Sequence, residues 1–455
     1  MPLLIIFAGI LLLLLLIMKF RLNAFVALLL VALMVGLAMG AAPTDVLASI
    51  QRGVGGTLGY LALILGLGAM LGSLLANSGA AETITSRLIG IFGEKRLPWA
   101  LMLTGFIVGI PMFYTVAFIM LIPIIFSVAQ RTGLPLVYVG IPMITSLSVT
   151  HGFLPPHPAP TAITVMYGAD ISLVLLYGLI LAVPTVILAG VVFGKTLRNF
   201  VTTPPAHLFK DPVEIGEHPG PSFGAAVGTA LIPVLLMGMG AVATLFFKPE
   251  ELTDSAGAVI GTSGGNPMLY QLFSFLGDPT IALLLSVLIG IYTLGVRQGR
   301  QLDAVMVNMA EGVKSIALIL LIIAGGGAFK QVLVDSGASA YIVDLMTGVR
   351  INPLLLAWLV AAFLRVALGS ATVAALTAAG IVLPLIATTD VSPELLVLAT
   401  GAGSLTLSQV NDTGFWLFKE YFGLTIPQTL RTWTVMETIV SVVGLVGCLL
   451  LDVAV

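Results

Sequence analysis

Long apolar runs alternate with short polar connections along the chain, and most runs approach the length that crosses a lipid bilayer. A transmembrane helix needs about 20 consecutive, mostly apolar residues. Runs of this kind cover 2–18, 22–41, 58–76, 170–194, 223–247, 270–296, 314–333 and 429–452. The pattern predicts an all-α membrane protein that crosses the bilayer many times.

Two further apolar regions, 97–130 and 353–388, are interrupted near their middle by turn-prone residues. The interruptions read GIPMFYT at 109–115 and LGSATVA at 368–374. Each arm then holds about 14 to 17 residues, roughly 21 to 26 Å of helix, which falls short of the ~30 Å hydrocarbon core. We therefore predict two re-entrant hairpins beside about ten full spans.

Two more regions, 135–168 and 393–422, read as discontinuous helices. They are broken by THGFLPPHPAPT at 150–161 and by SQVNDTGF at 408–415. Irregular backbone survives at membrane depth only where it is buried in protein or lines a water-filled cavity. We expect the hairpin tips and helix breaks to meet around a solute. Helix N-termini that point into such a site suit an anion, and a carboxylate fits best.

Several sequence blocks recur at one offset of 258 residues, which indicates an internal repeat. Asp45 corresponds to Asp303, NSGA at 77–80 to DSGA at 335–338, and SLS at 146–148 to SLT at 404–406. Equivalent elements lie five crossings apart, so the halves 1–194 and 223–455 must face opposite ways. This predicts an inverted repeat joined by a cytoplasmic linker at 195–222.

Composition and charge placement agree with this organisation. Hydrophobic residues make up 58% of the 455 residues and charged residues only 9%; the net charge of −2 favours no nucleic-acid partner, and one cysteine excludes a disulfide framework. With both termini outside, every Lys and Arg would be cytoplasmic except Arg52, Lys248, Lys330, Arg350 and the intramembrane Arg365. Such a bias follows the positive-inside rule.

Four stretches carry a resemblance to a known family. SLSVTHGFLPPHPAPTAIT (146–164), IAGGGAFKQVLVDSGA (323–338), LRVALGSATVAALTAAG (364–380) and VNDTGFWLFKEYF (410–422) closely resemble the gluconate permease (GntP) family, the gluconate:proton symporters. The idonate and gluconate branch is the most similar, and the resemblance covers essentially the whole chain. It implies import of a sugar acid across the bacterial inner membrane, coupled to H⁺, by a fold of the ion transporter superfamily. Elevator-type movement and a homodimer are implied as well.

Candidate site residues lie at the hairpin tips and helix breaks. Hydroxyl, amide and backbone groups there suit a polyol, and Arg365 could either bind the carboxylate or lock the hairpin to a carbonyl or to Asp412. The predicted substrate-binding residues are Tyr114, Thr115, Thr150, His151, Gly152, His157, Thr161, Arg365, Gly369, Ser370, Thr372, Gln409, Asn411 and Thr413. Asp412, His151 and His157 are the proton-coupling candidates, because an ionisable residue inside a membrane is functional by default. No cofactor or metal is expected, since a third ligand is missing near the two histidines.

Three departures from the family pattern bear on the proton. Thr115 stands where the family usually carries a glutamate after two aromatics, and Gln409 and Thr413 replace the histidine and proline of HVNDPG. If that glutamate carries the coupling proton in relatives, this chain must use another site or couple poorly. Glu437 in the last span is expected to reach the interface or to pair on the scaffold, outside the coupling machinery.

Three alternative functions remain open at this point. A transporter could carry another small carboxylate, such as a ketogluconate, a fructuronate or D-serine, which a competition series would separate. An intramembrane enzyme could use Asp412 or His151 with a neighbouring hydroxyl, but catalysis does not require an inverted repeat. A channel would show currents at channel-like rates, whereas two opposed hairpins favour alternating access.

Overall fold

The protein is a helical, multi-pass membrane protein. The computed structural model describes residues 2–200, 220–253, 259–263, 265–337, 351–386 and 389–455. Among them, eight helical segments are long and apolar enough to cross a membrane. The first two predicted spans form helices of only 17 and 15 residues, roughly 26 and 22 Å at ~1.5 Å per residue. The described residues thus hold fewer full-length spans than the ten predicted.

The first half of the chain is helical from Pro2 to Thr196 with short interruptions. Its elements are α1 (Pro2–Met18), α2 (Ala24–Ala38), α3 (Pro43–Asn77), α4 (Ala80–Phe92), η1 (Glu94–Arg96), α5 (Leu97–Gly109), α6 (Tyr114–Thr132), α7 (Leu136–Phe153), α8 (Pro158–Tyr167), α9 (Ile171–Thr185), η2 (Val186–Val192) and α10 (Phe193–Thr196). Most of the predicted linker, 201–219, lies outside the described residues.

The second half resumes at α11 and ends with α21. Its elements are α11 (Phe223–Val242), η4 (Ala243–Phe247), β1 (Glu250–Thr253), β2 (Val259–Ser263), α12 (Pro267–Gly277), α13 (Pro279–Gly290), η5 (Ile291–Gly295), η6 (Val296–Gln298), α14 (Leu302–Asp335), α16 (Pro353–Leu368), α17 (Ala371–Ile386), α18 (Pro393–Gly403), α19 (Thr413–Tyr421), α20 (Ile426–Thr429), η7 (Leu430–Thr434) and α21 (Val435–Asp452).

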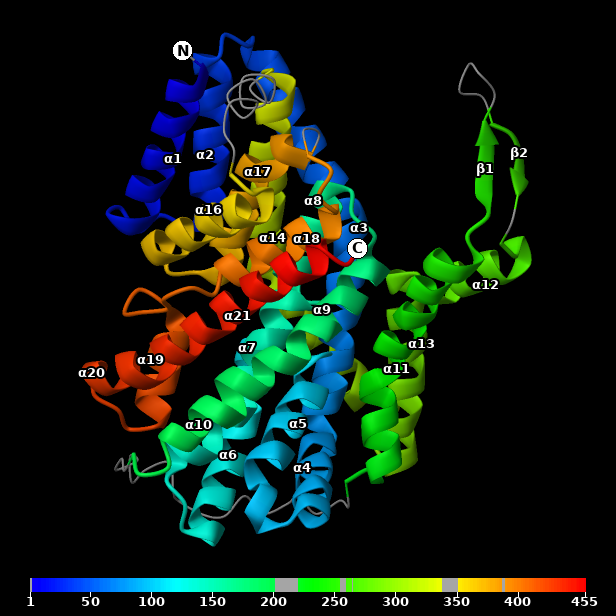
Figure 1. The fold of residues 1–455 in the computed structure, drawn as a ribbon, viewed down its shortest axis with the longest axis vertical. Helices are drawn as coiled ribbons and strands as arrows, with labels where there is room; N and C mark the ends of the chain where they lie inside the picture. Colours follow the sequence, from blue (N-terminus) through cyan, green and yellow to red (C-terminus); the bar gives the residue numbers. More distant parts are fainter. Residues whose placement is uncertain (1, 201–219, 254–258, 264, 338–350, 387–388) are drawn as a thin grey trace.

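Two details differ from the sequence prediction. The span expected at 270–296 is split at Asp278, whose carboxylate accepts hydrogen bonds from the backbone N–H groups of Thr280 and Ile281 at 2.8 and 3.3 Å and so begins a new helix, α13. In addition, β1 and β2 form a small antiparallel pair before α12. This pair extends away from the helices (Figure 1). The fold is therefore helical with one short β-hairpin, rather than purely α.

Helices α3 and α14 are the longest, with 35 and 34 residues, and they pack against each other. Their contact is very close. A Cβ atom added at Gly327 would lie 2.0 Å from Thr57 Oγ1, and one added at Gly53 would lie 2.4 Å from the carbonyl oxygen of Gly327. Only glycine allows this backbone approach. Gly327 therefore serves the close packing of α3 against α14.

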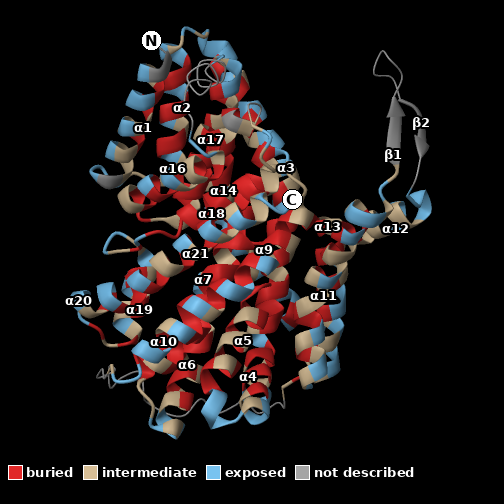
Figure 2. Cartoon of the chain, in the orientation of Figure 1, coloured by how far each residue is buried: buried red, intermediate tan, exposed pale blue. Residues whose placement is uncertain are grey.

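The centre of the molecule is formed by α5, α7, α9 and α18, where buried residues dominate, whereas α1, α11 and α12 carry more exposed residues (Figure 2). In α7 nearly every residue is buried. A helix that is apolar and buried all round is a core helix. The interrupted helix α7 thus lies inside protein, where its free backbone groups can find partners.

The chain leaves helical geometry at each of the four interruptions. The structure places breaks between α5 and α6 at 110–113, between α16 and α17 at 369–370, between α7 and α8 at 154–157, and between α18 and α19 at 404–412. Helix α6 is longer than the predicted hairpin arm, because it runs for 19 residues. The re-entrant course of the two helix pairs stays a prediction.

Candidate functional site

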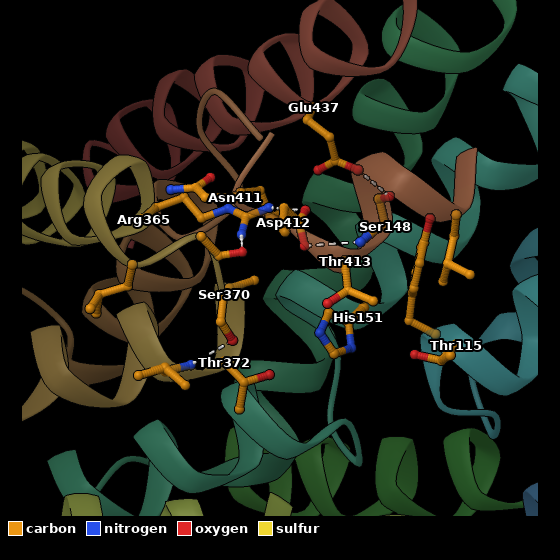
Figure 3. A pocket seen from close by; sticks show the side chains of 18 of the residues that line it. Thr115, Ser148, His151, Arg365, Ser370, Thr372, Asn411, Asp412, Thr413 and Glu437 are labelled. Carbon is orange, nitrogen blue, oxygen red and sulfur yellow. Dashed lines mark hydrogen bonds and ion pairs between the residues drawn. The ribbon is translucent and has the colours of Figure 1, made fainter. Parts of the chain in front are cut away.

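A cavity of about 300 Å³ lies where three of the four interruptions meet, those at 110–113, 369–370 and 404–412. This size is at the lower end of small-molecule sites. It is lined by the start of α6, by α7 and α14, by the α16–α17 turn, by the break before α19, and by η7 and α21 (Figure 3). The structure brings together nine of the predicted substrate residues here: Tyr114, Thr115, His151, Arg365, Gly369, Ser370, Thr372, Asn411 and Thr413.

An ion pair joins the two polar segments of the second half. Arg365, near the end of α16, is only 3% exposed and its Nη2 donates to Asp412 Oδ2 at 2.5 Å. Its Nη1 donates to the carbonyl oxygen of Gly369, also at 2.5 Å. Asp412 accepts two further hydrogen bonds, from the Ser408 hydroxyl and from the backbone N–H of Gly414. Arg365 therefore makes both of the locking contacts that the sequence left open, and Asp412 caps α19.

The α16–α17 turn is pressed against the α18–α19 break. Gly369 has φ +75°, and a Cβ atom there would lie 2.2 Å from the carbonyl oxygen of Asn411. Asn411 Nδ2 in turn donates to the carbonyl oxygen of Val366 at 2.9 Å. A residue with a side chain would have to adopt a strained left-handed conformation and force the two segments apart. The glycine is needed for both reasons.

The other five predicted substrate residues lie outside the cavity. Thr150, Gly152, Thr161 and His157 are buried in the packing of α7 and α8, and Gln409 Nε2 donates to the carbonyl oxygen of Val366 at 3.3 Å. His157 Nε2 is 2.9 Å from the carbonyl oxygen of Gly109, so it binds the α5–α6 break. A Cβ atom at Gly152 would clash with Leu405. Thr150, Gly152, His157 and Gln409 are thus engaged in structural contacts.

Helix N-termini and hydroxyl groups give the cavity its polar character. Helices α6, α17 and α19 each begin with a residue that lines the cavity. The first N–H groups of a helix have no partner within the helix and carry a partial positive charge. The hydroxyl groups of Tyr114, Thr115, Ser370, Thr372 and Thr413 lie beside them. An anion with several hydroxyl groups would find matching donors and acceptors here.

Two polar residues of the cavity were missed by the sequence reasoning. Glu437, on α21, is 2% exposed and lines the cavity, so the expectation that it reaches the interface is wrong. Ser148, on α7, donates to Glu437 Oε1 at 2.5 Å (Figure 3). Ser148 lies three residues before His151, hence on the same helix face, and this spacing could have identified it.

The lining offers recognition groups for a polar anion. No cluster of three or more His, Cys, Asp or Glu side chains forms a metal-binding group in the described part of the chain. What the cavity combines is one guanidinium, two carboxyl groups, one imidazole and several hydroxyl groups. Such a set can bind and release a hydrophilic solute.

Comparison with known proteins places the chain in a family. A family model described as "GntP family permease" matches residues 1–454. The chain is 52% identical to the high-affinity gluconate transporter and 51% identical to the Gnt-II system L-idonate transporter of Escherichia coli K12, over 100% and 99% of both sequences respectively. It is 46% identical to the gluconate permease of Bacillus subtilis 168, again over 100% of both chains.

Solved structures of more distant transporters share the fold. The YdaH transporter of Alcanivorax borkumensis superposes with a TM-score of 0.62 at 18% identity, covering 94% of this chain and 97% of that one. MtrF of Neisseria gonorrhoeae superposes with a TM-score of 0.61 at 12% identity, covering 95% and 94%. At this identity the likeness concerns the fold alone. The full-length match and the close relatives show that the chain belongs to the GntP permease family and is a transporter rather than an enzyme.

Proposed function

We propose that the protein imports gluconate or a closely related sugar acid across the bacterial inner membrane, in symport with H⁺. The observation that carries the proposal is the cavity, in which a buried guanidinium and the N-termini of three helices lie beside a set of hydroxyl groups. A sugar acid has one carboxylate and a chain of hydroxyl groups, which require these two kinds of partner. The names of the close relatives support the same substrate class.

The carboxylate of the substrate would lie near Arg365. The Nε atom of Arg365 is buried and has no hydrogen-bond partner among the described residues, although both Nη atoms are engaged. An approaching carboxylate could accept from this Nε–H and from backbone N–H groups in the first turns of α17 and α19, other than those of Val373 and Gly414, which already donate to Ser370 and Asp412. Substrate hydroxyl groups would then contact polar side chains at the start of α6, on α7, at the α16–α17 turn and at the α18–α19 break. These are Tyr114, Thr115, His151, Ser370, Thr372, Asn411 and Thr413.

Alternating access would move this cavity between the two sides of the membrane. We propose an elevator-type movement within a homodimer, with both termini external, as the family resemblance implies. Asp412, His151 and His157 are the coupling candidates that the sequence offers. Crosslinking in native membranes tests the dimer, and tagging of each terminus tests the orientation.

Uptake into liposomes tests the function. Purified protein should accumulate labelled gluconate when the outside is acidified, whereas protein-free liposomes should not. Uptake that ignores the pH gradient would refute the proton coupling but not the substrate class. Absence of any gluconate uptake or exchange by folded protein would refute the substrate class.

A competition series separates the neighbouring substrates. Unlabelled gluconate and L-idonate should compete strongly, because relatives named for each substrate are almost equally similar to this chain. Ketogluconate, fructuronate and D-serine should compete more weakly. The reverse order would assign the alternative small-carboxylate function.

A further inference from the structure

Glu437 is a buried carboxyl group whose role neither the fold nor substrate binding explains. Its Oε1 accepts from Ser148 Oγ, while its Oε2 is buried and has no hydrogen-bond partner among the described residues. None of the ion pairs between described residues includes it. A carboxylate removed from water without a countercharge is destabilised, and a proton removes that penalty.

The other carboxyl group of the cavity is in the opposite situation. Asp412 accepts hydrogen bonds from Arg365, from the Ser408 hydroxyl and from the backbone N–H of Gly414. A guanidinium and hydrogen-bond donors at these distances form a charge-assisted pair with a carboxylate. Asp412 is thus suited to a permanent ion pair, and its negative charge balances that of Arg365.

The charge balance of the cavity then depends on Glu437. Of the Asp, Glu, Lys and Arg side chains that line the cavity, Arg365 and Asp412 cancel, and Glu437 remains. An empty cavity with ionised Glu437 carries one negative charge. A cavity that holds a sugar-acid carboxylate carries the same single charge only when Glu437 is protonated. Anion binding and proton binding would therefore favour each other.

Four other titratable or charged side chains face the same cavity as Glu437. Tyr114 from α6, His151 from α7, Arg365 from α16 and Asp412 from the α18–α19 break share the cavity with it. His151 Nδ1 is buried without a hydrogen-bond partner, and its ring lies 6.0 Å from that of Tyr114.

The charged residues of two further elements packed against α21 are placed elsewhere. Arg431 of η7 is exposed, and Glu394 of α18 accepts a hydrogen bond from the backbone N–H of Asp170. No basic side chain from these two elements competes for Glu437.

We propose that Glu437 carries the coupling proton, an inference that rests on the proposed symport of a sugar acid. A proton from the external solution forms the O–H bond at Oε2 as the anion binds. The same O–H bond breaks and the proton passes to cytoplasmic water when the anion leaves. Ser148 positions the carboxyl group, and the Arg365–Asp412 pair keeps its charge throughout.

The decisive experiment compares accumulation with exchange in proteoliposomes for wild type, Glu437→Gln and the control Glu394→Gln. For a one-to-one symport, an inward gradient of one pH unit supports up to about tenfold accumulation of gluconate. Wild type and the control should approach this ratio. Glu437→Gln should accumulate to a ratio of about 1, while its exchange of labelled for unlabelled gluconate stays within about threefold of wild type.

Each other outcome has a defined meaning. Accumulation by Glu437→Gln that equals wild type overturns the inference, as does a parallel loss of accumulation and exchange in folded protein. Failure of wild type itself to respond to the gradient refutes the proposed symport instead.

Proton uptake on gluconate binding to detergent-solubilised protein gives a second measure if Glu437→Gln does not fold. We expect about one proton per gluconate for wild type and for Glu437→Asp, with the pH of half-maximal uptake shifted in the variant. An unshifted pH of half-maximal uptake in Glu437→Asp would overturn the assignment.

Discussion

Replacement of Gly369 by alanine tests whether the contact between the α16–α17 turn and the α18–α19 break sets the shape of the binding cavity. Gly369 ends α16 with φ +75°, a left-handed conformation that costs an alanine about 1–2 kcal/mol. The new Cβ atom would also lie 2.2 Å from the carbonyl oxygen of Asn411 and 2.6 Å from its carbonyl carbon. Both atoms belong to the backbone, so no side-chain rotation relieves the overlap.

The size of the effect follows from these distances. A carbon atom rests at roughly 3.3 Å or more from a carbonyl oxygen, so the turn and the break must separate by about 1 Å. Forced overpacking of this kind costs roughly 1–3 kcal/mol, which with the backbone term gives about 2–5 kcal/mol. Ser370 and Thr372 move with the turn. We expect a 10- to 100-fold loss of uptake efficiency, since a 1 Å displacement of positioning groups has effects of about 100-fold in enzymes.

Gly133→Ala is the matched control. Gly133 ends α6 with φ +67°, and a Cβ atom there would meet nothing within 4 Å. The Gly133→Ala variant therefore has the free-energy cost of the left-handed backbone conformation but no steric clash. Initial rates of labelled gluconate uptake, together with thermal unfolding of each variant, separate the cost of the left-handed backbone from the cost of the clash. Uptake by Gly369→Ala within twofold of Gly133→Ala would refute the reasoning that the close contact shapes the site.

Three further predictions rest on individual contacts. Asp412→Asn leaves the buried Arg365 guanidinium without its countercharge, which typically costs about 3–5 kcal/mol of stability. The variant should unfold at a lower temperature, and its gluconate exchange and accumulation should fall together. Selective loss of accumulation would instead assign the proton to Asp412. Gly327→Ala should destabilise the contact of α3 with α14 by roughly 1–3 kcal/mol. The control Gly326→Ala, whose Cβ would meet only a side chain at 3.5 Å, should unfold near the wild-type temperature. Equal unfolding temperatures of the two variants would contradict the close packing of these helices. Ser370→Ala should raise the KM for gluconate roughly three- to tenfold with little change in maximal rate, because one hydroxyl contact contributes about 0.5–1.5 kcal/mol; an unchanged KM would remove Ser370 from the substrate contacts.

The class of protein and the places where its helices break could be predicted because local chemistry determines both. Apolar runs of sufficient length can only be membrane or core helices. The prolines at 155 and 156 cannot continue α7, and those at 158 and 160 fit only in the first turn of a new helix, α8. The interruptions at 110–113 and 369–370 were equally readable from their glycine residues and turn-prone neighbours. These features depend on a few adjacent residues, so the sequence determines them without knowledge of the tertiary fold.

The partners of each polar side chain could not be predicted in the same way. Arg365 could have bound substrate or locked the turn, and only the tertiary arrangement shows that its Nη atoms contact Gly369 and Asp412. His157 and Gln409 were expected in the substrate site, yet each reaches a backbone carbonyl group freed by a helix break. A polar residue beside a helix break can hydrogen-bond either to the solute or to the exposed backbone, and sequence alone does not distinguish these two partners.

The burial of Glu437 was missed although the sequence held a usable signal. Its position near the start of the last span suggested a side chain that could reach the interface. The residues four, seven and eleven positions further on are Ser441, Gly444 and Cys448, and small or weakly polar residues mark the protein-facing side of a transmembrane helix. All three are buried in the structure, on the same face as Glu437. Helical spacing therefore predicts the direction of an intramembrane carboxyl group better than its distance from the end of the span does.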